Sequence, residues 1–172
     1  MHIVNPATEE IIKEVNEDNK ESCAKKFKAL QAAQCLWKNF SLEERIKILS
    51  SFQNLLFQNI EALAAILTSE VGKPLQQSRN EINGACARIK WLLENAPKYL
   101  SDEWMKDEEE MKERISYEPL GVICNISAWN YPYLVSMNVL VPALISGNGV
   151  FYKPSEFATL TGLEIVRSTT QP

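Results

Sequence analysis

The sequence predicts an α/β fold in which a group of N-terminal helices precedes the first strands of an open parallel sheet. Its 172 residues suffice for one domain, and a composition of 45% apolar and 23% charged residues is that of an ordinary globular protein. Apolar residues recur at spacings of three and four over residues 20–98, which indicates helices. Over residues 122–169, short β-prone runs alternate with helical stretches, which favours parallel strands joined by right-handed crossovers.

The first elements are extended and then helical. Two short extended pieces are predicted within residues 3–16, with a turn at residues 5–8 between them. A helix follows from about residue 20 to about residue 40. Its apolar positions are Ala24, Phe27, Leu30, Ala33 and Trp37.

The next helix carries a start signal in its own sequence. Ser41 and Glu44 form a capping box, in which the serine oxygen accepts a backbone N–H and the glutamate reaches back to the cap. One apolar stripe then predicts a single helix that ends at Gly72-Lys73-Pro74. The stripe consists of Ile46, Leu49, Phe52, Leu56, Ile60, Leu63 and Leu67. A third helix is predicted over residues 74–98, with Ile82, Cys86, Ile89, Leu92 and Leu93 facing inward.

The segment 101–113 is rich in acidic residues and favours a solvated loop or the tip of a hairpin. Its acidic residues are Asp102, Glu103, Asp107, Glu108, Glu109, Glu110 and Glu113. Residues 114–118 are predicted to be extended. A strand at residues 122–126 is followed by a helix to about residue 146, which Pro142 is expected to kink. A turn at residues 147–149, a buried strand at 150–152 and a helix at 161–169 complete the pattern.

Composition excludes several classes of function. The net charge of −4, from 18 basic and 22 acidic residues, argues against a nucleic-acid partner. The first residues lack the features of a signal peptide, and the most apolar stretch, 131–152, is interrupted by polar and helix-breaking residues. We therefore expect no membrane segment and a cytoplasmic protein. The only histidine is His2, and the cysteines lack zinc-ligand spacing, so we expect no metal site and four reduced, buried or half-buried thiols.

Two polar clusters follow the two predicted parallel strands, at residues 127–130 and 153–156. Open parallel sheets bind ligands at these carboxyl ends of their strands. Lys153 and Glu156 could hold the hydroxyls of a ribose, and a carboxylate there would favour NAD over NADP; the alternative is a surface ion pair of little consequence. Asn130 could donate its amide N–H to a developing oxyanion, or it could simply bond the local backbone of its loop. No G-x-G-x-x-G, Walker A or H-E-x-x-H pattern is present.

Five sequence blocks, in order, resemble the aldehyde dehydrogenase superfamily. They are residues 5–8 (NPAT), 70–74 (EVGKP), 118–122 (EPLGV), 126–132 (ISAWNYP) and 147–156 (GNGVFYKPSE). The form AWNYP is similar to the betaine- and semialdehyde-oxidising branches. Gly149 departs from the pattern, where a threonine, alanine or cysteine is expected, and it is expected to loosen the turn.

The resemblance implies an incomplete aldehyde dehydrogenase fold with a Rossmann-like sheet. Residues 1–172 would be a partial NAD(P)-binding domain without the catalytic domain, and residues 101–118 would belong to the oligomerisation hairpin. Asn130 would be the oxyanion donor, and Lys153 and Glu156 would hold the adenosine ribose on a turn shaped by Pro154 and Ser155. The cofactor would be lined by Ile126, Ser127, Ala128 and Trp129.

The implied reaction is the NAD(P)-dependent oxidation of an aldehyde to a carboxylic acid by a homo-oligomeric enzyme. The family's nucleophilic cysteine and general-base glutamate lie beyond the matched blocks, so this chain alone is expected to be inactive and to bind NAD weakly. The alternatives are a non-catalytic nucleotide-binding module and a subunit-interaction module. A bare strand edge would leave Ile126, Val150 and Phe151 exposed, so we expect the isolated chain to aggregate.

Overall fold

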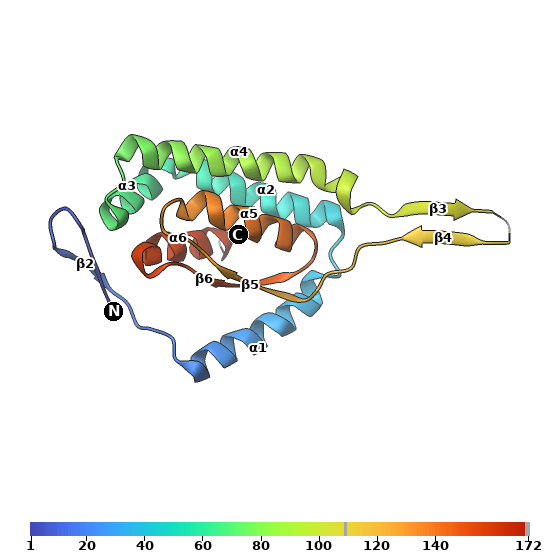
Figure 1. Cartoon of the computed structure of the whole chain (residues 1–172), viewed down its shortest axis with the longest axis horizontal. Coiled ribbons are helices and arrows are strands. Elements are labelled where there is room, and N and C mark those ends of the chain that lie inside the picture. Colours follow the sequence, from blue (N-terminus) through green and yellow to red (C-terminus); the bar gives the residue numbers. More distant parts are fainter. Residues whose placement is uncertain (109, 171–172) are drawn as a thin grey trace.

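The computed structural model describes residues 1–108 and 110–170; Glu109 of the acidic segment and residues 171–172 of the predicted domain lie outside the described residues. The chain begins with a small antiparallel hairpin of β1 (His2–Val4) and β2 (Ile11–Glu14). The predicted turn lies between them, where Asn5 Oδ1 accepts a hydrogen bond from the Ala7 N–H at 2.9 Å. This hairpin lies at one end of the molecule (Figure 1).

Helix α1 (Lys20–Trp37) begins with a capping box of Asn19 and Ser22. It crosses one face of the parallel sheet (Figure 1), where the rings of Phe27 and Phe151 meet edge to face at 6.0 Å. The one buried residue among its described positions is Gln34, whose Nε2 donates to the Gly147 carbonyl at 2.9 Å. The ring contact of Phe27 and the hydrogen bond of Gln34 therefore attach α1 to the sheet and to the turn before β6.

The predicted helix from Ser41 to Gly72 is in fact two helices, α2 (Leu42–Gln58) and α3 (Ile60–Val71). The capping box of Ser41 and Glu44 is present as expected. The break lies at Asn59, whose φ of −107° and ψ of 17° are not helical and whose Nδ2 donates to the Leu55 carbonyl at 2.8 Å. The apolar stripe continues across the break, which is why its periodicity did not reveal the interruption.

Helix α4 (Leu75–Leu100) packs against α2, α3 and α5 (Pro132–Ile145), and the main apolar core lies among these helices. Its inward face is the predicted one, with Ile82, Ile89 and Leu93 buried and Leu92 half-buried. Pro97 lies inside the last turns of the helix. Glu81 of α4 accepts the Tyr133 N–H at the beginning of α5, so α4 also holds the first turn of that helix.

The acidic segment forms a hairpin of β3 (Glu103–Asp107) and β4 (Lys112–Ile115) that projects away from the body of the molecule (Figure 1). Ion pairs bridge it, including Lys112 Nζ to Asp107 Oδ1 and Arg114 to Asp102, both at 3.0 Å. Its large apolar side chains are exposed: Trp104, Met105, Met111 and Ile115. Of the two expectations for this segment, the structure therefore has the hairpin.

The sheet consists of β5 (Val122–Ile126) and β6 (Gly149–Lys153), which pair in parallel with Val122 opposite Gly149 and Ile126 opposite Lys153. Helix α5 forms the crossover, and the short 3-10 helix η1 (Glu156–Ala158) leads into α6 (Thr159–Thr170). Helices α5 and α6 contact each other and cover the face opposite α1.

The strand predicted at residues 150–152 is present, but its three residues are half-buried rather than buried as expected. Among the described residues, β6 pairs only with β5, so its other edge has no neighbouring strand. Ile126 is 74% exposed, as expected, whereas Val150 and Phe151 are partly covered. Aggregation through this edge stays a prediction.

Glycine at position 149 has a packing role that the sequence did not reveal. A Cβ there would lie 3.1 Å from Leu30 Cδ1 and 3.3 Å from Gln34 Cβ, so the glycine lets α1 approach the sheet. The turn itself is made by Gly147, whose φ of 85° suits glycine. The expected loosening of the turn by Gly149 stays a prediction.

Two of the four cysteines also differ from expectation. All four are free thiols, but Cys35 and Cys124 are exposed, whereas Cys23 is half-buried and Cys86 is buried. Cys124 lies on β5 at the uncovered part of the sheet, which explains its exposure. No helix within residues 1–108 and 110–170 is long and apolar enough to cross a membrane.

Candidate nucleotide site

The carboxyl ends of β5 and β6 bring together the two predicted polar clusters. The Ser127 N–H donates to the Lys153 carbonyl at 3.0 Å, which continues the ladder between the strands by one further bond. The strand ends that carry residues 126–130 and 153–156 therefore lie next to each other, as the parallel arrangement predicts.

Lys153 and Glu156 face each other on the surface of this edge. Lys153 Nζ lies 3.1 Å from Glu156 Oε2, and the two side chains are 56% and 61% exposed. The backbone N–H of Glu156 and then the Lys153 ammonium hold the pKa of the Glu156 carboxyl below its usual value. An exposed pair of this kind adds little to stability, so both groups remain accessible to a ligand.

The turn that carries this pair is tightly built. Ser155 is buried, and its Oγ accepts the Phe157 N–H at 3.2 Å, which caps η1. Pro154 packs against Gly162 of α6, where a Cβ would come within 2.4 Å of Pro154 Cβ. The role of Pro154 and Ser155 in a cofactor-binding turn stays a prediction.

The other strand end presents one ring and one buried hydroxyl. Trp129 is exposed, and its ring meets the Phe157 ring edge to face at 6.2 Å. Ser127 is buried, and its Oγ lies 2.7 Å from Ser136 Oγ. This hydroxyl is therefore hydrogen-bonded inside the protein and does not face the solvent. Ile126 is exposed and Ala128 half-buried beside them.

Asn130 is exposed near the end of the loop that leads from β5 into α5. Its Oδ1 accepts the Tyr131 N–H at 3.0 Å, and its carbonyl accepts a hydrogen bond from Lys73 Nζ at 2.6 Å. The first bond is the local backbone bond that the alternative reading of Asn130 expects. It also occupies the acceptor end of the amide, so the donor end is the one left to meet a ligand.

Sequence reasoning missed a buried ion pair next to Asn130. Lys73 Nζ contacts the Glu81 carboxylate and lies 4.0 Å from the centre of the Tyr131 ring. Glu81 Oε1 accepts the N–H groups of Tyr133 at 2.8 Å and Leu134 at 3.4 Å. The helical spacing of α4 could have revealed this carboxylate. Glu81 lies next to Ile82 and four residues before Ala85, so the periodicity places it on the buried face of the helix.

A second missed carboxylate, Glu70, lies at the beginning of α6. Its Oε1 accepts the Leu160 N–H at 2.6 Å, and its Oε2 accepts both the N–H and the Oγ1 hydroxyl of Thr161 at 2.9 Å. Glu70 is buried in α3 and is fixed there by these three bonds.

The family model described as "Aldehyde dehydrogenase family" matches residues 1–171. This chain belongs to the aldehyde dehydrogenase family. The enzymes of that family are oxidoreductases that use NAD(P), and the predicted incomplete α/β fold is confirmed. The same strand ends that carry Asn130 and the pair of Lys153 and Glu156 thus lie within the matched region.

Individual relatives give the extent of the match. The chain is 30% identical over 163 residues to a succinate semialdehyde dehydrogenase of Acinetobacter baylyi, covering 95% of this chain and 34% of the relative. A betaine aldehyde dehydrogenase variant from Staphylococcus aureus in complex with NAD⁺ is 28% identical, with a TM-score of 0.91, over 98% of this chain and 34% of that one. A glyceraldehyde-3-phosphate dehydrogenase from Methanocaldococcus jannaschii complexed with NADP is 25% identical, with a TM-score of 0.91, over 98% and 37%.

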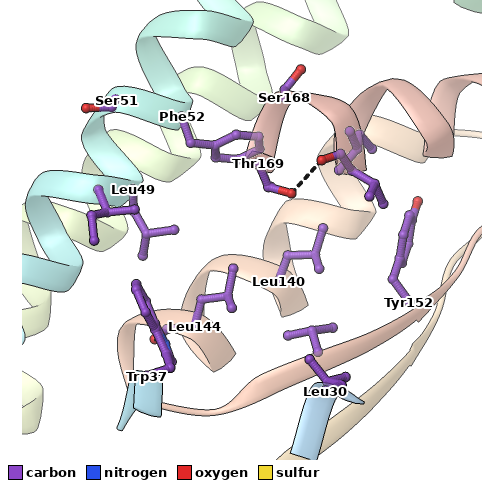
Figure 2. Close-up of a pocket in the computed structure, with 14 residues that line it drawn as sticks. Leu30, Trp37, Leu49, Ser51, Phe52, Leu140, Leu144, Tyr152, Ser168 and Thr169 are labelled. Carbon is purple, nitrogen blue, oxygen red and sulfur yellow. Dashed lines mark hydrogen bonds between the residues drawn. The ribbon is translucent and has the colours of Figure 1, made fainter. Parts of the chain in front are cut away.

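The chain therefore spans about a third of the length of the relatives it matches, which fits the N-terminal portion of an aldehyde dehydrogenase. An apolar cavity of about 480 Å³ lies in the interior beside these elements (Figure 2). Side chains of α1, α2, α5, α6 and β6 line this cavity, among them Leu30, Phe52, Leu144, Val150 and Tyr152. Its lining is mostly apolar, so it does not resemble a site for a polar nucleotide.

Proposed function

We propose that this chain forms the adenosine-binding part of an NAD-dependent aldehyde dehydrogenase and contributes the oxyanion donor of that enzyme. The observation that carries the proposal is the parallel pairing of β5 with β6. It brings the segment that carries Trp129 and Asn130 and the segment that carries Lys153 and Glu156 to the same edge of the sheet. Family membership supports a nicotinamide cofactor at this edge.

The side chains at this edge fit the adenosine end of such a cofactor. Lys153 Nζ can donate to ribose hydroxyls and the Glu156 carboxylate can accept from them, and both are exposed. A carboxylate in this place repels a 2′-phosphate, so NAD is the proposed cofactor rather than NADP. A bound nicotinamide would supply the hydride acceptor for the oxidation of an aldehyde.

Asn130 is proposed to stabilise the oxyanion that forms when a nucleophile attacks the aldehyde carbonyl. Its Oδ1 is held by the Tyr131 N–H, which leaves the Nδ2 hydrogens to donate. Its carbonyl is held by Lys73, so the loop is fixed on both sides of the side chain.

The 172-residue chain alone is proposed to be inactive, because none of its cysteines takes the place of the family's nucleophile. Cys124 lies within β5, and Cys23, Cys35 and Cys86 lie on α1 and α4. The aldehyde itself is left open, since the relatives are named for different aldehydes.

The test is to titrate the purified chain with NAD⁺ and NADP⁺ by protein-observed NMR, and to assay it for NADH formation with an aldehyde. We expect weak NAD⁺ binding that Lys153→Ala and Glu156→Ala abolish, while Lys90→Ala, which alters another exposed pair, leaves it unchanged. Glu156→Gln should improve NADP⁺ binding relative to NAD⁺. Binding that ignores Lys153 and Glu156 would refute the site, and NADH formation by rigorously purified chain would refute its inactivity.

A second function is favoured by the hairpin of β3 and β4, which is proposed as a homo-oligomerisation element. It projects from the body and exposes Trp104, Met105 and Ile115. Sedimentation of the chain and of Trp104→Lys, which also removes the contact of that ring with Arg114, tests this proposal. A monomer at all concentrations would contradict it. The cytoplasmic location stays a prediction.

A further inference from the structure

We infer that the site at these strand ends recognises an uncharged nucleoside, and that the phosphates of a nucleotide add little to its binding by this chain. The inference rests on the proposed function, because it takes the edge formed by residues 126–130 and 153–156 as the adenosine site. It goes further by assigning Glu70 and Glu81 the role of excluding phosphate.

A helix follows each of the two strands. The first N–H groups of a helix have no partners within the helix, and together with the helix dipole they attract anions. In nucleotide-binding folds the N-terminus of a helix that follows a strand is therefore the usual place for a phosphate. This chain has two such helices, α5 after β5 and α6 after β6.

The N-terminus of α5 is already filled. Its first residue, Pro132, has no N–H to offer. The next two N–H groups, of Tyr133 and Leu134, both donate to Glu81 Oε1. Lys73, the nearby cation, is engaged by Glu81 and by the Asn130 carbonyl. A phosphate would have to displace a carboxylate that is completely buried.

The N-terminus of α6 is filled in the same way. Glu70 accepts the N–H groups of Leu160 and Thr161 and the Thr161 hydroxyl. In the preceding η1, the N–H groups of Phe157 and Ala158 donate to Ser155. The Glu70 carboxylate projects from α3 and is buried, so it cannot turn aside without breaking three hydrogen bonds.

Both helix N-termini thus carry anions built into α3 and α4. A ligand phosphate at either one would find the N–H groups occupied and a carboxylate in its place, and burial strengthens that repulsion. The charged groups that remain at the edge, Lys153 and Glu156, neutralise each other at 3.1 Å. This arrangement suits hydroxyls and an aromatic base against Trp129, and it gives no net attraction for an anion.

The experiment compares adenosine, AMP and ADP-ribose as ligands of the wild-type chain at constant ionic strength, with the Trp129 indole resonance as the NMR probe. We expect the three dissociation constants to agree within about threefold. AMP or ADP-ribose binding tenfold or more tightly than adenosine would overturn the inference while leaving the proposed adenosine site intact. Failure of all three to perturb Trp129 would overturn the proposed function and the inference with it.

Removing one built-in charge should reverse the preference. Glu70→Gln and, separately, Glu81→Gln are expected to raise the affinity for AMP relative to adenosine by at least about threefold, because each deletes a negative charge. Glu70→Gln also leaves an N–H group of α6 without its acceptor, and Glu81→Gln leaves Lys73 without its carboxylate. Glu94→Gln removes the same charge from an exposed position of α4 and should leave the ratio unchanged. Circular dichroism checks that each variant is folded. An unchanged ratio in folded Glu70→Gln and Glu81→Gln would refute their role.

Discussion

Lys73 and Glu81 form a buried ion pair that ties the turn between α3 and α4 to the loop preceding α5. The Lys73 side chain is 10% exposed and that of Glu81 is fully buried. Lys73 also donates to the Asn130 carbonyl at 2.6 Å, and Glu81 accepts the Tyr133 N–H at 2.8 Å. The pair therefore holds both sides of the loop that carries the proposed oxyanion donor.

Breaking this pair from one side should be costly. Lys73→Met leaves the Glu81 carboxylate buried without its cation, and we expect a loss of about 3–5 kcal/mol in the free energy of unfolding. The measurement is urea denaturation followed by circular dichroism. Lys90→Met, which removes an exposed partner of Glu94 at 3.8 Å, should cost less than about 0.5 kcal/mol. Equal losses in the two variants would show that the buried pair contributes no more to the free energy of unfolding than the exposed pair.

The hydrogen bonds of Glu70 should contribute directly to the stability of α6. Glu70→Ala removes the acceptor of three bonds at the helix N-terminus, and the expected loss is about 2–3 kcal/mol. Urea denaturation measures it, and Glu94→Ala at an exposed position is the control. Hydrogen exchange of the Leu160 and Thr161 amides should accelerate in Glu70→Ala, and unchanged protection there would contradict the capping role.

Replacing two helical glycines with alanine should change the stability of the chain in opposite directions. A Cβ at Gly162 would lie 2.4 Å from Pro154 Cβ, so Gly162→Ala should destabilise the chain by about 1–3 kcal/mol and disturb the turn at Lys153. A Cβ at Gly84, within α4, meets nothing within 4 Å, so Gly84→Ala should stabilise by up to about 1 kcal/mol. Thermal unfolding of the two variants side by side decides the matter. Stabilisation by both would mean that α6 moves freely away from Pro154.

The four thiols should react at different rates. Burial raises the pKa of the Cys86 thiol from 9.0 to about 11, so near neutral pH it stays protonated as well as shielded. Cys35 and Cys124 are exposed and should be labelled first, then half-buried Cys23. Labelling with a maleimide, followed by peptide mass spectrometry, gives the order. Fast labelling of Cys86 in the folded chain would contradict its burial.

The raised pKa of Cys86 also makes the free energy of unfolding depend on pH. The folded chain favours the neutral thiol, so the contribution of Cys86 is complete below pH 9 and declines as the pH rises from 9.0 towards 11. Cys86→Ala should reduce this alkaline decline in the free energy of unfolding. An identical pH profile above pH 9 in wild type and variant would contradict the assignment.

Local signals in the sequence were enough to predict most of the helices and strands. The capping box at Ser41 and the periodicities of α1 and α4 depend on residues within a turn or two of one another, so they can be read directly. The break at Asn59 was missed because the apolar stripe continues through it. The half-exposure of β6 was missed because it depends on which strands are present beside it, which no local pattern records.

The sequence by itself determined the order of helices and strands, the parallel connection of the two strand ends and the family, because spacing, capping and ordered motifs are properties of nearby residues. The tertiary structure alone decided where the buried charges go. Glu81 meets the Tyr133 N–H across 52 positions, and Glu70 meets that of Leu160 across 90. A buried carboxylate takes whichever donors the packing brings to it, so its partners follow from the folded arrangement of α3 and α4 against α5 and α6.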